Sequence, residues 1–305
     1  MRGKREMQCL TRVKNLVFCK DGRPMKNPFN DKSYLNVTDE KFKEDRIWLV
    51  NPDCHKSYFG LTEQNREEFE CILHKARPNP NASCFPDFMF DNGFIEHFRV
   101  TSSVVTRKGA THTRKEQEFQ SIVDTETAML ESEWNETPSF DEVRSKTWMF
   151  SNPEHSHEYL VDSFKNNWEH HIESYSKYSG AKQTGIFMIE YPEVALSMCE
   201  NVYHPWINGM SHGDMREQEK FSEYRLSRDK KLLEYVYRFK DCIHYVVFVN
   251  LERVEVICSE NIPYLLNLLP WDYVIYPLHV ATIASVRNIS VPTNSIQGDE
   301  KNDKT

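Results

Sequence analysis

Two carboxylates, Asp87 and Glu96, flank a short turn and are of the residue type that hydrolytic metal sites use. Aromatic-rich runs precede and follow Asn92-Gly93, a dipeptide typical of a tight β-hairpin. A two-residue turn would place the two carboxylates on adjacent antiparallel strands, at the same position of the sheet. Such a pair, together with water, forms a hard oxygen site suited to Mg²⁺ or Mn²⁺, which can polarise a scissile phosphate and help deprotonate the attacking water.

Further helices and strands would have to position this hairpin. Apolar residues recur at helical spacing after Thr62, which can act as the N-cap, and Pro78 closes that helix. A second helix is predicted at about 158–178, and residues 184–191 are predicted to form a buried strand. This alternation of strands and helices predicts an α/β fold.

The order of helix, strand with Pro-Asp, hairpin, strand with Glu, helix and strand resembles the core of the PD-(D/E)XK nucleases. The segments 85–88 (FPDF) and 94–98 (FIEHF) resemble the "PDF … IEHF" variant of that superfamily, and the resemblance covers about residues 63–191. It implies a restriction-endonuclease-like mixed central sheet flanked by helices, with N- and C-terminal additions. It also implies that Asp87 and Glu96 bind Mg²⁺ or Mn²⁺ and that the chain hydrolyses phosphodiester bonds, with DNA as the expected substrate.

Members of the superfamily usually add a glutamate from the preceding helix. Glu68 is the best match for this third metal ligand, and Glu67 and Glu70 stay open as alternatives. Each of these glutamates also fits a solvated helix face, because they lie in an acidic run.

The position of the superfamily's lysine, two residues after Glu96, is occupied by Phe98. In some members the lysine lies on the following helix, so Lys165 is the candidate catalytic lysine and Lys108 is a second candidate. A correctly aimed amine from another element could still position the water and offset negative charge on the phosphate.

Histidines near these residues have several interpretations. The His97 side chain should point to the opposite face of its strand from Glu96, because side chains alternate along a strand. His171 and Tyr175 share a helix face and resemble, with His in place of Gln, the Gln-x-x-x-Tyr element of one nuclease branch. A zinc site is a further hypothesis, although its candidates match no zinc-binding spacing: His155, His157, His170 and His171.

Composition limits the classes of partner. The formal charge of -8 at pH 7 disfavours a protein coated with nucleic acid, because phosphate binding draws on Lys and Arg. A basic stretch from His97 to Lys115 is nevertheless compatible with docking a phosphate backbone, or with a solvated loop. No signal-peptide-like or bilayer-length apolar run occurs, and the eight cysteines contain no CxxC pair. We therefore expect a cytoplasmic protein that does not enter membranes.

We predict a nuclease-like core at residues 61–192, preceded by a strand-and-loop addition at 1–60. An α/β extension packed on the core would occupy 193–287, with a loop at 197–222, and 288–305 would form a disordered tail. Within the extension, the pattern predicts helices at 226–239 and 262–269 and strands at 245–249, 254–257 and 273–283.

Two classes of function follow. The first is a metal-dependent endonuclease for restriction, phage defence or repair, and cutting both DNA strands would favour a homodimer. The second is a non-catalytic nuclease-like module that binds nucleic acid or a protein partner, with Phe98 as the trace of lost chemistry. A third interpretation, a chance Pro-Asp pair in an unrelated α/β protein, predicts carboxylates that lie far apart. No P-loop, GxGxxG, nucleophile elbow or HExxH motif offers another chemistry.

Overall fold

The structure of the chain is a computed structural model. Its backbone contacts divide the chain into two units, one of residues 1–107 with 154–278 and one of residues 108–153 with 279–305. The description below covers residues 3–18, 23–24, 46–50, 55–81, 83–106, 109–136, 143–151, 153–193, 195–203, 215–221, 223–251, 253–268, 273–278 and 281–289.

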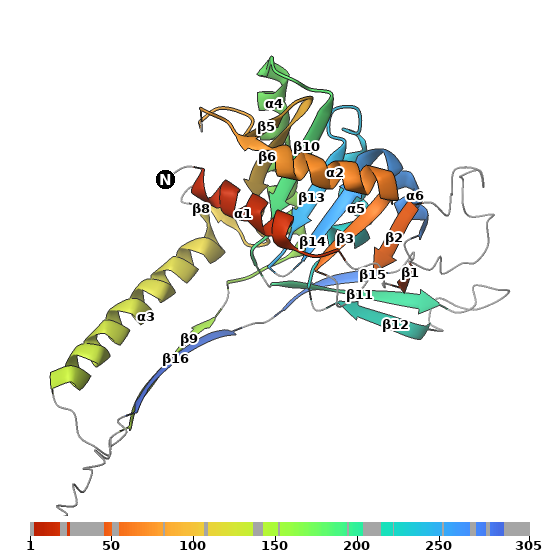
Figure 1. The fold of residues 1–305 in the computed structure, drawn as a ribbon. Coiled ribbons are helices and arrows are strands. Elements are labelled where there is room, and N and C mark those ends of the chain that lie inside the picture. Colours follow the sequence, from red (N-terminus) through yellow and green to blue (C-terminus); the bar gives the residue numbers. More distant parts are fainter. Residues whose placement is uncertain are drawn as a thin grey trace, which may run out of the picture. The chain divides into compact units, whose positions relative to one another are not determined.

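A mixed β-sheet forms the centre of the first unit (Figure 1). Neighbours run parallel in the pairs β3–β14, β13–β10 and β10–β6, and antiparallel in β2–β3, β13–β14 and β5–β6. Two-residue strands, β1 (Arg23–Pro24) and β4 (Arg77–Pro78), extend its edges. The predicted α/β fold with a mixed central sheet is therefore confirmed. In spatial order, its seven longer strands are β2 (Arg46–Val50), β3 (Lys56–Thr62), β14 (Val254–Cys258), β13 (Tyr245–Val249), β10 (Thr184–Glu190), β6 (Gly93–Arg99) and β5 (Phe88–Phe90).

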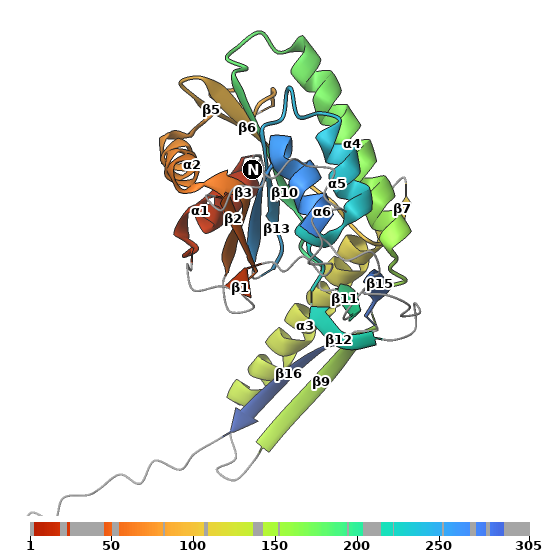
Figure 2. The same ribbon diagram turned by 90° about the vertical axis from the view of Figure 1, so that its right-hand side faces the viewer.

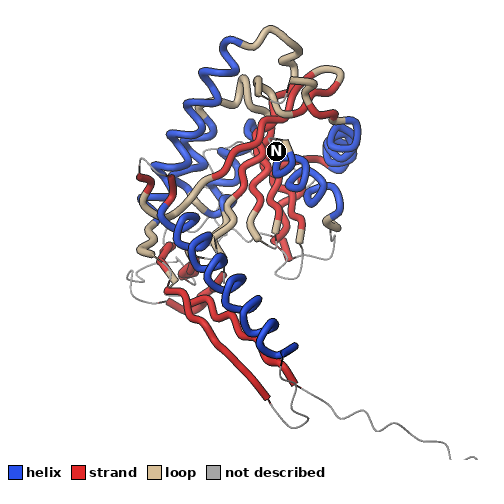
Figure 3. Tube along the Cα trace, turned by 90° about the vertical axis from the view of Figure 1, so that its left-hand side faces the viewer, coloured by secondary structure: helices blue, strands red, loops and turns tan. Residues whose placement is uncertain are grey.

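Helices cover both faces of this sheet (Figure 2). On one face, α1 (Lys4–Asn15) and α2 (Glu63–Lys75) pack on a cluster that includes Ile95. On the other, α4 (His157–Lys177), α5 (Lys230–Tyr237) and α6 (Ile262–Leu268) pack on a cluster that includes Phe94 and Phe98. Because side chains alternate along β6, residues 94, 96 and 98 face α4, and residues 95 and 97 face the other layer. Figure 3 shows the strands between these two helical layers.

Several local predictions are confirmed. The Thr62 hydroxyl accepts a hydrogen bond from the Asn65 N–H (3.1 Å) and so caps α2. The hairpin forms with Asp91 and Asn92 as its turn residues. Gly93 belongs to β6, and it is needed there because a Cβ would lie 2.0 Å from the Thr184 carbonyl oxygen of β10. Its role is thus to allow the close approach of β6 to β10.

Other local predictions are wrong. The 1–60 segment was expected to hold only strands and loops, but α1 begins at Lys4. The 197–222 segment was expected to be a loop, but β11 (Leu196–Tyr203) and β12 (Met215–Phe221) pair there, and β11 also pairs with β15 (Tyr273–Pro277). Polar residues dominate β12, so hydrophobic alternation could not reveal it.

Later elements follow the predictions with shifted boundaries. The predicted strand at 273–283 is interrupted, because β15 ends at Pro277 and β16 (Ala281–Ile289) begins four residues later. The predicted helix at 226–239 is a 3₁₀ turn, η2 (Leu226–Arg228), followed by α5. A second 3₁₀ turn, η3 (Ser259–Asn261), precedes α6. The predicted tail at 288–305 starts too early, because Asn288 and Ile289 belong to β16, and residues 290–305 lie outside the described residues.

The second unit consists of one long helix, α3 (Thr111–Glu136), and a β-ribbon of β9 (Val143–Ser151) and β16. The ribbon's Phe150 packs on Phe119 of the helix, with 5.4 Å between ring centroids. Lys146 also forms an ion pair with Glu126 of the helix (2.6 Å). In sequence, residues 108–153 interrupt the segment 61–192 that was predicted as the core. The predicted domain boundaries at 60, 192 and 287 stay predictions.

Two short strands, β7 (Val105–Thr106) and β8 (Gly109–Ala110), lie on either side of residue 107, where the first unit is interrupted in the chain.

Among the described helices, none combines the length and the apolar character needed to cross a membrane.

A buried carboxylate organises the loop that follows β6. Glu193 is 2% exposed and accepts hydrogen bonds from the Thr101 hydroxyl, the Ser102 N–H (2.8 Å) and the Ser102 hydroxyl (2.9 Å). The Ser102 hydroxyl also lies 2.8 Å from His155 Nδ1, just before α4. Glu193 therefore ties the end of β6 to the loop after β10.

Replacing Glu193 with Ala should destabilise the protein by about 3 kcal/mol or more, because three buried donors would lose their acceptor. Urea unfolding monitored by circular dichroism measures this change, and Glu154→Ala, at an exposed glutamate nearby, is the control. A loss below about 1 kcal/mol would show that water replaces the carboxylate without cost.

Candidate active site

Asp87 and Glu96 meet where β5 begins. The Asp87 N–H donates to Glu96 Oε2 (2.9 Å), and Asp87 Oδ2 accepts from the His97 N–H (2.8 Å). The reason is local: β5 begins only at Phe88, so it has no backbone acceptor opposite His97, and the Pro86 carbonyl accepts instead from Asn79 Nδ2 (2.8 Å). The Asp87 carboxylate therefore accepts the hydrogen bond that a backbone carbonyl would accept in a longer strand. The structure thus brings the two predicted carboxylates together.

The proximity of the two carboxylates changes their electrostatics. Burial, and then the neighbouring Glu96 charge, raise the pKa of Asp87 from 3.8 to about 6, although the bond from the His97 N–H lowers it. Two carboxylates this close cannot both be ionised without cost, and a cation between them would remove that cost.

His171 of α4 completes the group. Its Nδ1 lies 2.7 Å from Glu96 Oε1, and 17% of its side chain is exposed. With Glu96 ionised, Nδ1 carries the proton and donates it, which leaves the Nε2 lone pair for another partner. The sequence suggested His171 only through a weak resemblance to a Gln-x-x-x-Tyr element, and the structure gives that residue a direct contact with Glu96.

Phe98 holds the imidazole of His171 in place. The two rings stack with 4.8 Å between centroids and 13° between planes. Phe98 is 5% exposed and also meets Trp168 and Phe187 edge-on. The position expected for the nuclease lysine is thus part of the hydrophobic core, and a histidine from α4 lies above it.

Lys165 lies elsewhere on α4. Its Nζ is 5.0 Å from the ring centroid of Tyr235, a residue of α5. The position of Lys165, six residues before His171, turns it about 120° away around the helix. Its predicted catalytic role stays a prediction, and Lys108, the second candidate, lies outside the described residues.

The three α2 glutamates have other partners. Glu68 accepts from Gln64 (3.0 Å), Glu67 pairs with Arg66 (3.5 Å), and Glu70 pairs with Lys56 (2.5 Å). The α2 helix covers the sheet face opposite the one that Glu96 occupies. The structure therefore does not place Glu68 with Asp87 and Glu96, and its assignment as a metal ligand stays a prediction.

The negative charge of Glu6, a residue of α1, also acts on Asp87 and contributes to raising the Asp87 pKa. Its spacing to Leu10 and Val13, both buried, puts it on the sheet-facing side of α1. The i, i+4, i+7 spacing of these residues is the sequence signal that could have revealed it.

His97 faces the opposite side of β6 from Glu96, as predicted. Its Nε2 lies 3.4 Å from Glu190 Oε2, and Arg99 Nε lies 3.2 Å from the same oxygen. Burial alone would raise the pKa of Glu190, but the bond from His97 and the Arg99 charge outweigh it and lower that pKa. This arrangement neutralises the buried acid and supplies no ligand to Glu96.

The hypothetical zinc site finds no support in the described residues, where no three His, Cys, Asp or Glu side chains are grouped to hold a metal. His155 contacts Ser102, and His157 contacts the buried Asp229 (2.6 Å). A pair of carboxylates is a different case, because Mg²⁺ commonly binds through one or two carboxylates and keeps several waters. Asp87 Oδ2 accepts the His97 N–H, and among the described residues no hydrogen bond reaches Asp87 Oδ1.

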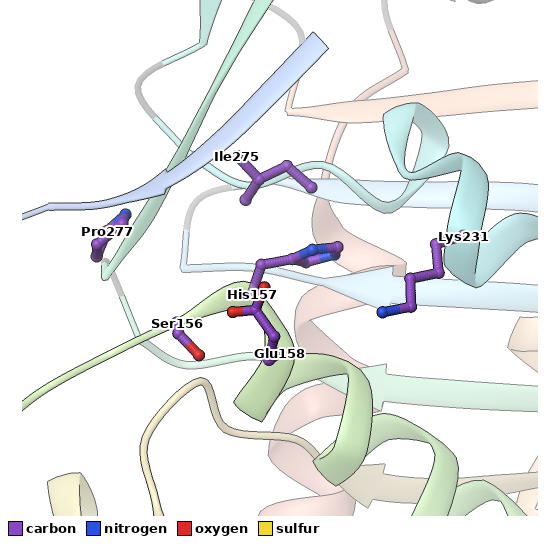
Figure 4. A pocket seen from close by; sticks show the side chains of 6 residues that line it. All are labelled: Ser156, His157, Glu158, Lys231, Ile275 and Pro277. Carbon is purple, nitrogen blue, oxygen red and sulfur yellow. The ribbon is translucent and has the colours of Figure 1, made fainter.

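A pocket of about 300 Å³ lies at the start of α4 (Figure 4). His157 is about 21 Å along the helix from His171, given the rise of 1.5 Å per residue. The pocket is therefore separate from the carboxylate pair. Its lining residues are Ser156, His157, Glu158, Lys231, Ile275 and Pro277.

A scan against protein-family models, a search of curated proteins and a search of solved structures each found no match for this chain.

Replacing Asp87 with Asn should stabilise the protein at high pH, because the amide oxygen can still accept from the His97 N–H without facing the Glu96 charge. The raised pKa means that wild-type stability is fully present below about pH 4 and is lost as pH rises through 6. The Asp87→Asn gain should thus be close to zero at pH 4 and about 1 to 3 kcal/mol at pH 8.

Urea unfolding at several pH values measures this gain, with Asp162→Asn, at an exposed aspartate of α4, as the control. A variant that is less stable than wild type at every pH would contradict the electrostatic crowding of the pair.

Proposed function

We propose that this chain is a metal-dependent nuclease that hydrolyses phosphodiester bonds in DNA. The observation that carries the proposal is that the Glu96 carboxylate accepts from the Asp87 N–H while the Asp87 carboxylate accepts from the adjacent His97 N–H, with His171 hydrogen-bonded to Glu96. In this proposal the fold is the restriction-endonuclease-like variety of α/β sheet, and Mg²⁺ or Mn²⁺ is the cofactor.

The order of elements supports the proposal. Along the chain, α2, the Asp87 strand β5, the Glu96 strand β6, α4 and β10 follow in the order that the nuclease resemblance implies. β10 then pairs in parallel with β6, with Phe187 opposite Glu96. Residues 108–153 enter this order as an insertion before α4.

The donor set suits a hard divalent cation. Asp87 and Glu96 would hold it through carboxylate oxygens. When bound, such an ion would polarise the scissile phosphate and lower the pKa of a bound water.

The chain's own groups would supply the proton chemistry. Glu96 orients the imidazole of His171 through Nδ1, and Nε2 is then positioned to accept a proton from the attacking water. The stacked Phe98 keeps the imidazole in this orientation. His171 would thereby take over the water-positioning task of the lysine that Phe98 replaces.

A non-catalytic module remains the second candidate, and a specific observation favours it. The bonds from the Asp87 N–H to Glu96 and from the His97 N–H to Asp87 complete the sheet edge by themselves. Phe98 is also packed as an ordinary core residue. In that case the chain would bind nucleic acid or a protein partner, and neither carboxylate would be needed for binding.

The deciding experiment is cleavage of supercoiled plasmid, linear duplex and single-stranded DNA with Mg²⁺ or Mn²⁺. Wild type should cut, and Asp87→Asn and Glu96→Gln should each lose at least about 100-fold in rate, since a bound metal contributes several kcal/mol. His171→Ala should lose about 100-fold, the usual contribution of a positioned base.

Lys165→Ala, from the same helix as His171, and Glu68→Gln, from α2, are the controls, and in this proposal both should keep rates within about threefold of wild type. A large loss of cleavage rate in Lys165→Ala would instead assign the water-positioning role to Lys165 rather than to His171. Absence of cleavage by wild type with either metal, or full activity in Asp87→Asn, would leave the non-catalytic module as the better account. Gel filtration of the DNA-bound protein tests the homodimer.

A further inference from the structure

An aromatic cluster adjoins the carboxylate pair. Phe85 lies 5.1 Å from Phe94 and 5.4 Å from Tyr178, and Phe94 lies 5.6 Å from Tyr175, all between ring centroids. Phe94 is fully buried, whereas Phe85, Tyr175 and Tyr178 each keep part of their surface exposed. The cluster thus has a buried floor and a partly exposed rim.

The chain places this cluster next to the proposed active site. Phe85 is two residues before Asp87, and Phe94 is two residues before Glu96 on the same face of β6. Two strand residues span about 7 Å, and Tyr175 lies one helical turn, about 5.4 Å, beyond His171. A nucleotide rises about 3.4 Å along a stacked strand, so the rim is one or two nucleotides from Asp87.

A lysine lies at the same rim. Lys182 Nζ lies 4.4 Å from the Tyr175 ring centroid and 6.0 Å from that of Tyr178. Lysine beside exposed aromatic rings is the combination with which proteins bind a single strand, since the amine meets phosphate and the ring meets the base.

Gly180 lets Tyr178 take its position. A Cβ on Gly180 would lie 2.2 Å from the Tyr178 hydroxyl oxygen, so the tyrosine side chain lies against the backbone of the loop that follows α4. The ring is thereby fixed at the rim before any ligand arrives, which lowers the entropic cost of stacking on it.

We propose that Phe85, Tyr175 and Tyr178 stack an unpaired base of single-stranded DNA, while Lys182 binds its phosphate. The inference rests on the proposed nuclease function and names its substrate class. A duplex buries its base faces and offers none to this rim, so single strands, or strand ends that have opened, would be the preferred substrate. The stacking tolerates any sequence because every base has a π-face.

The test is fluorescence anisotropy of the full-length protein in EDTA, where no metal-dependent cleavage occurs. The probes are a labelled oligothymidylate, the same oligonucleotide with abasic sites, and a duplex of equal length. Wild type should bind the oligothymidylate about tenfold more tightly than the abasic strand, as expected when one base stacks. The duplex should bind more weakly than the oligothymidylate.

Variants assign this preference to the rim. Tyr178→Leu keeps the apolar volume but should bring the two single-stranded probes to equal affinity, and Tyr178→Phe should keep the preference. Tyr237→Leu is the matched control, because Tyr237 also carries a lysine over its ring (Lys240, 5.7 Å) but lies on α5. It should leave all affinities unchanged, and melting curves check that each variant is folded.

Equal affinity of wild type for normal and abasic strands, tighter binding to duplex, or no binding to any probe would overturn the stacking site. So would a folded Tyr178→Leu variant that keeps the preference. Because the readout needs no hydrolysis, the two proposals fail separately. Base-dependent binding without cleavage would remove the nuclease and keep the stacking site, and cleavage without base preference would do the reverse.

Discussion

The reciprocal bonds between the Asp87 segment and β6 are the interaction on which the candidate site depends. A seven-residue strand faces a three-residue partner, so the His97 N–H needs an acceptor that the backbone does not offer. The Asp87 side chain supplies that acceptor, and its own N–H fixes Glu96. One structural need thus brings two acids together, and burial, followed by the neighbouring Glu96 charge, raises the pKa of Asp87. Placing two acids close together lowers stability, and functional sites commonly contain such destabilising arrangements.

Helix α4 extends this arrangement along the strand. Along α4, Trp168 meets Phe98, His171 meets Glu96 and Tyr175 meets Phe94 of β6, so these side chains form one stripe. Tyr178, the residue after the helix, also meets Phe94. Apolar packing at both ends of this stripe therefore sets the position of the one imidazole in its middle. This arrangement explains why position 98 holds a phenylalanine. A lysine there would remove the ring on which His171 stacks. The same stripe ends at the aromatic rim, so the proposed active site and the proposed stacking site would share one helix.

Patterns within a few neighbouring residues were sufficient to predict the hairpin and its two acids. The Asn92-Gly93 turn predicted the hairpin, and the hairpin predicted that Asp87 and Glu96 would meet. Contacts between distant elements are set by packing across the whole unit, so the sequence favoured Lys165 and Glu68 and could not show that His171 contacts Glu96. Strand β12 was missed for a related reason, since its polar residues give no alternation and its pairing with β11 comes from distant chain.

The most direct test of the central claim is calorimetric titration of the metal-free protein with Mn²⁺. The account predicts one ion bound per chain, with affinity lowered at least about tenfold in Asp87→Asn and in Glu96→Gln and unchanged in Glu68→Gln, as expected when one ligand of a small set is lost. Absence of Mn²⁺ binding by wild type, or equal binding by the Asp87→Asn variant, would contradict it and leave the carboxylate pair as a structural feature of the hairpin.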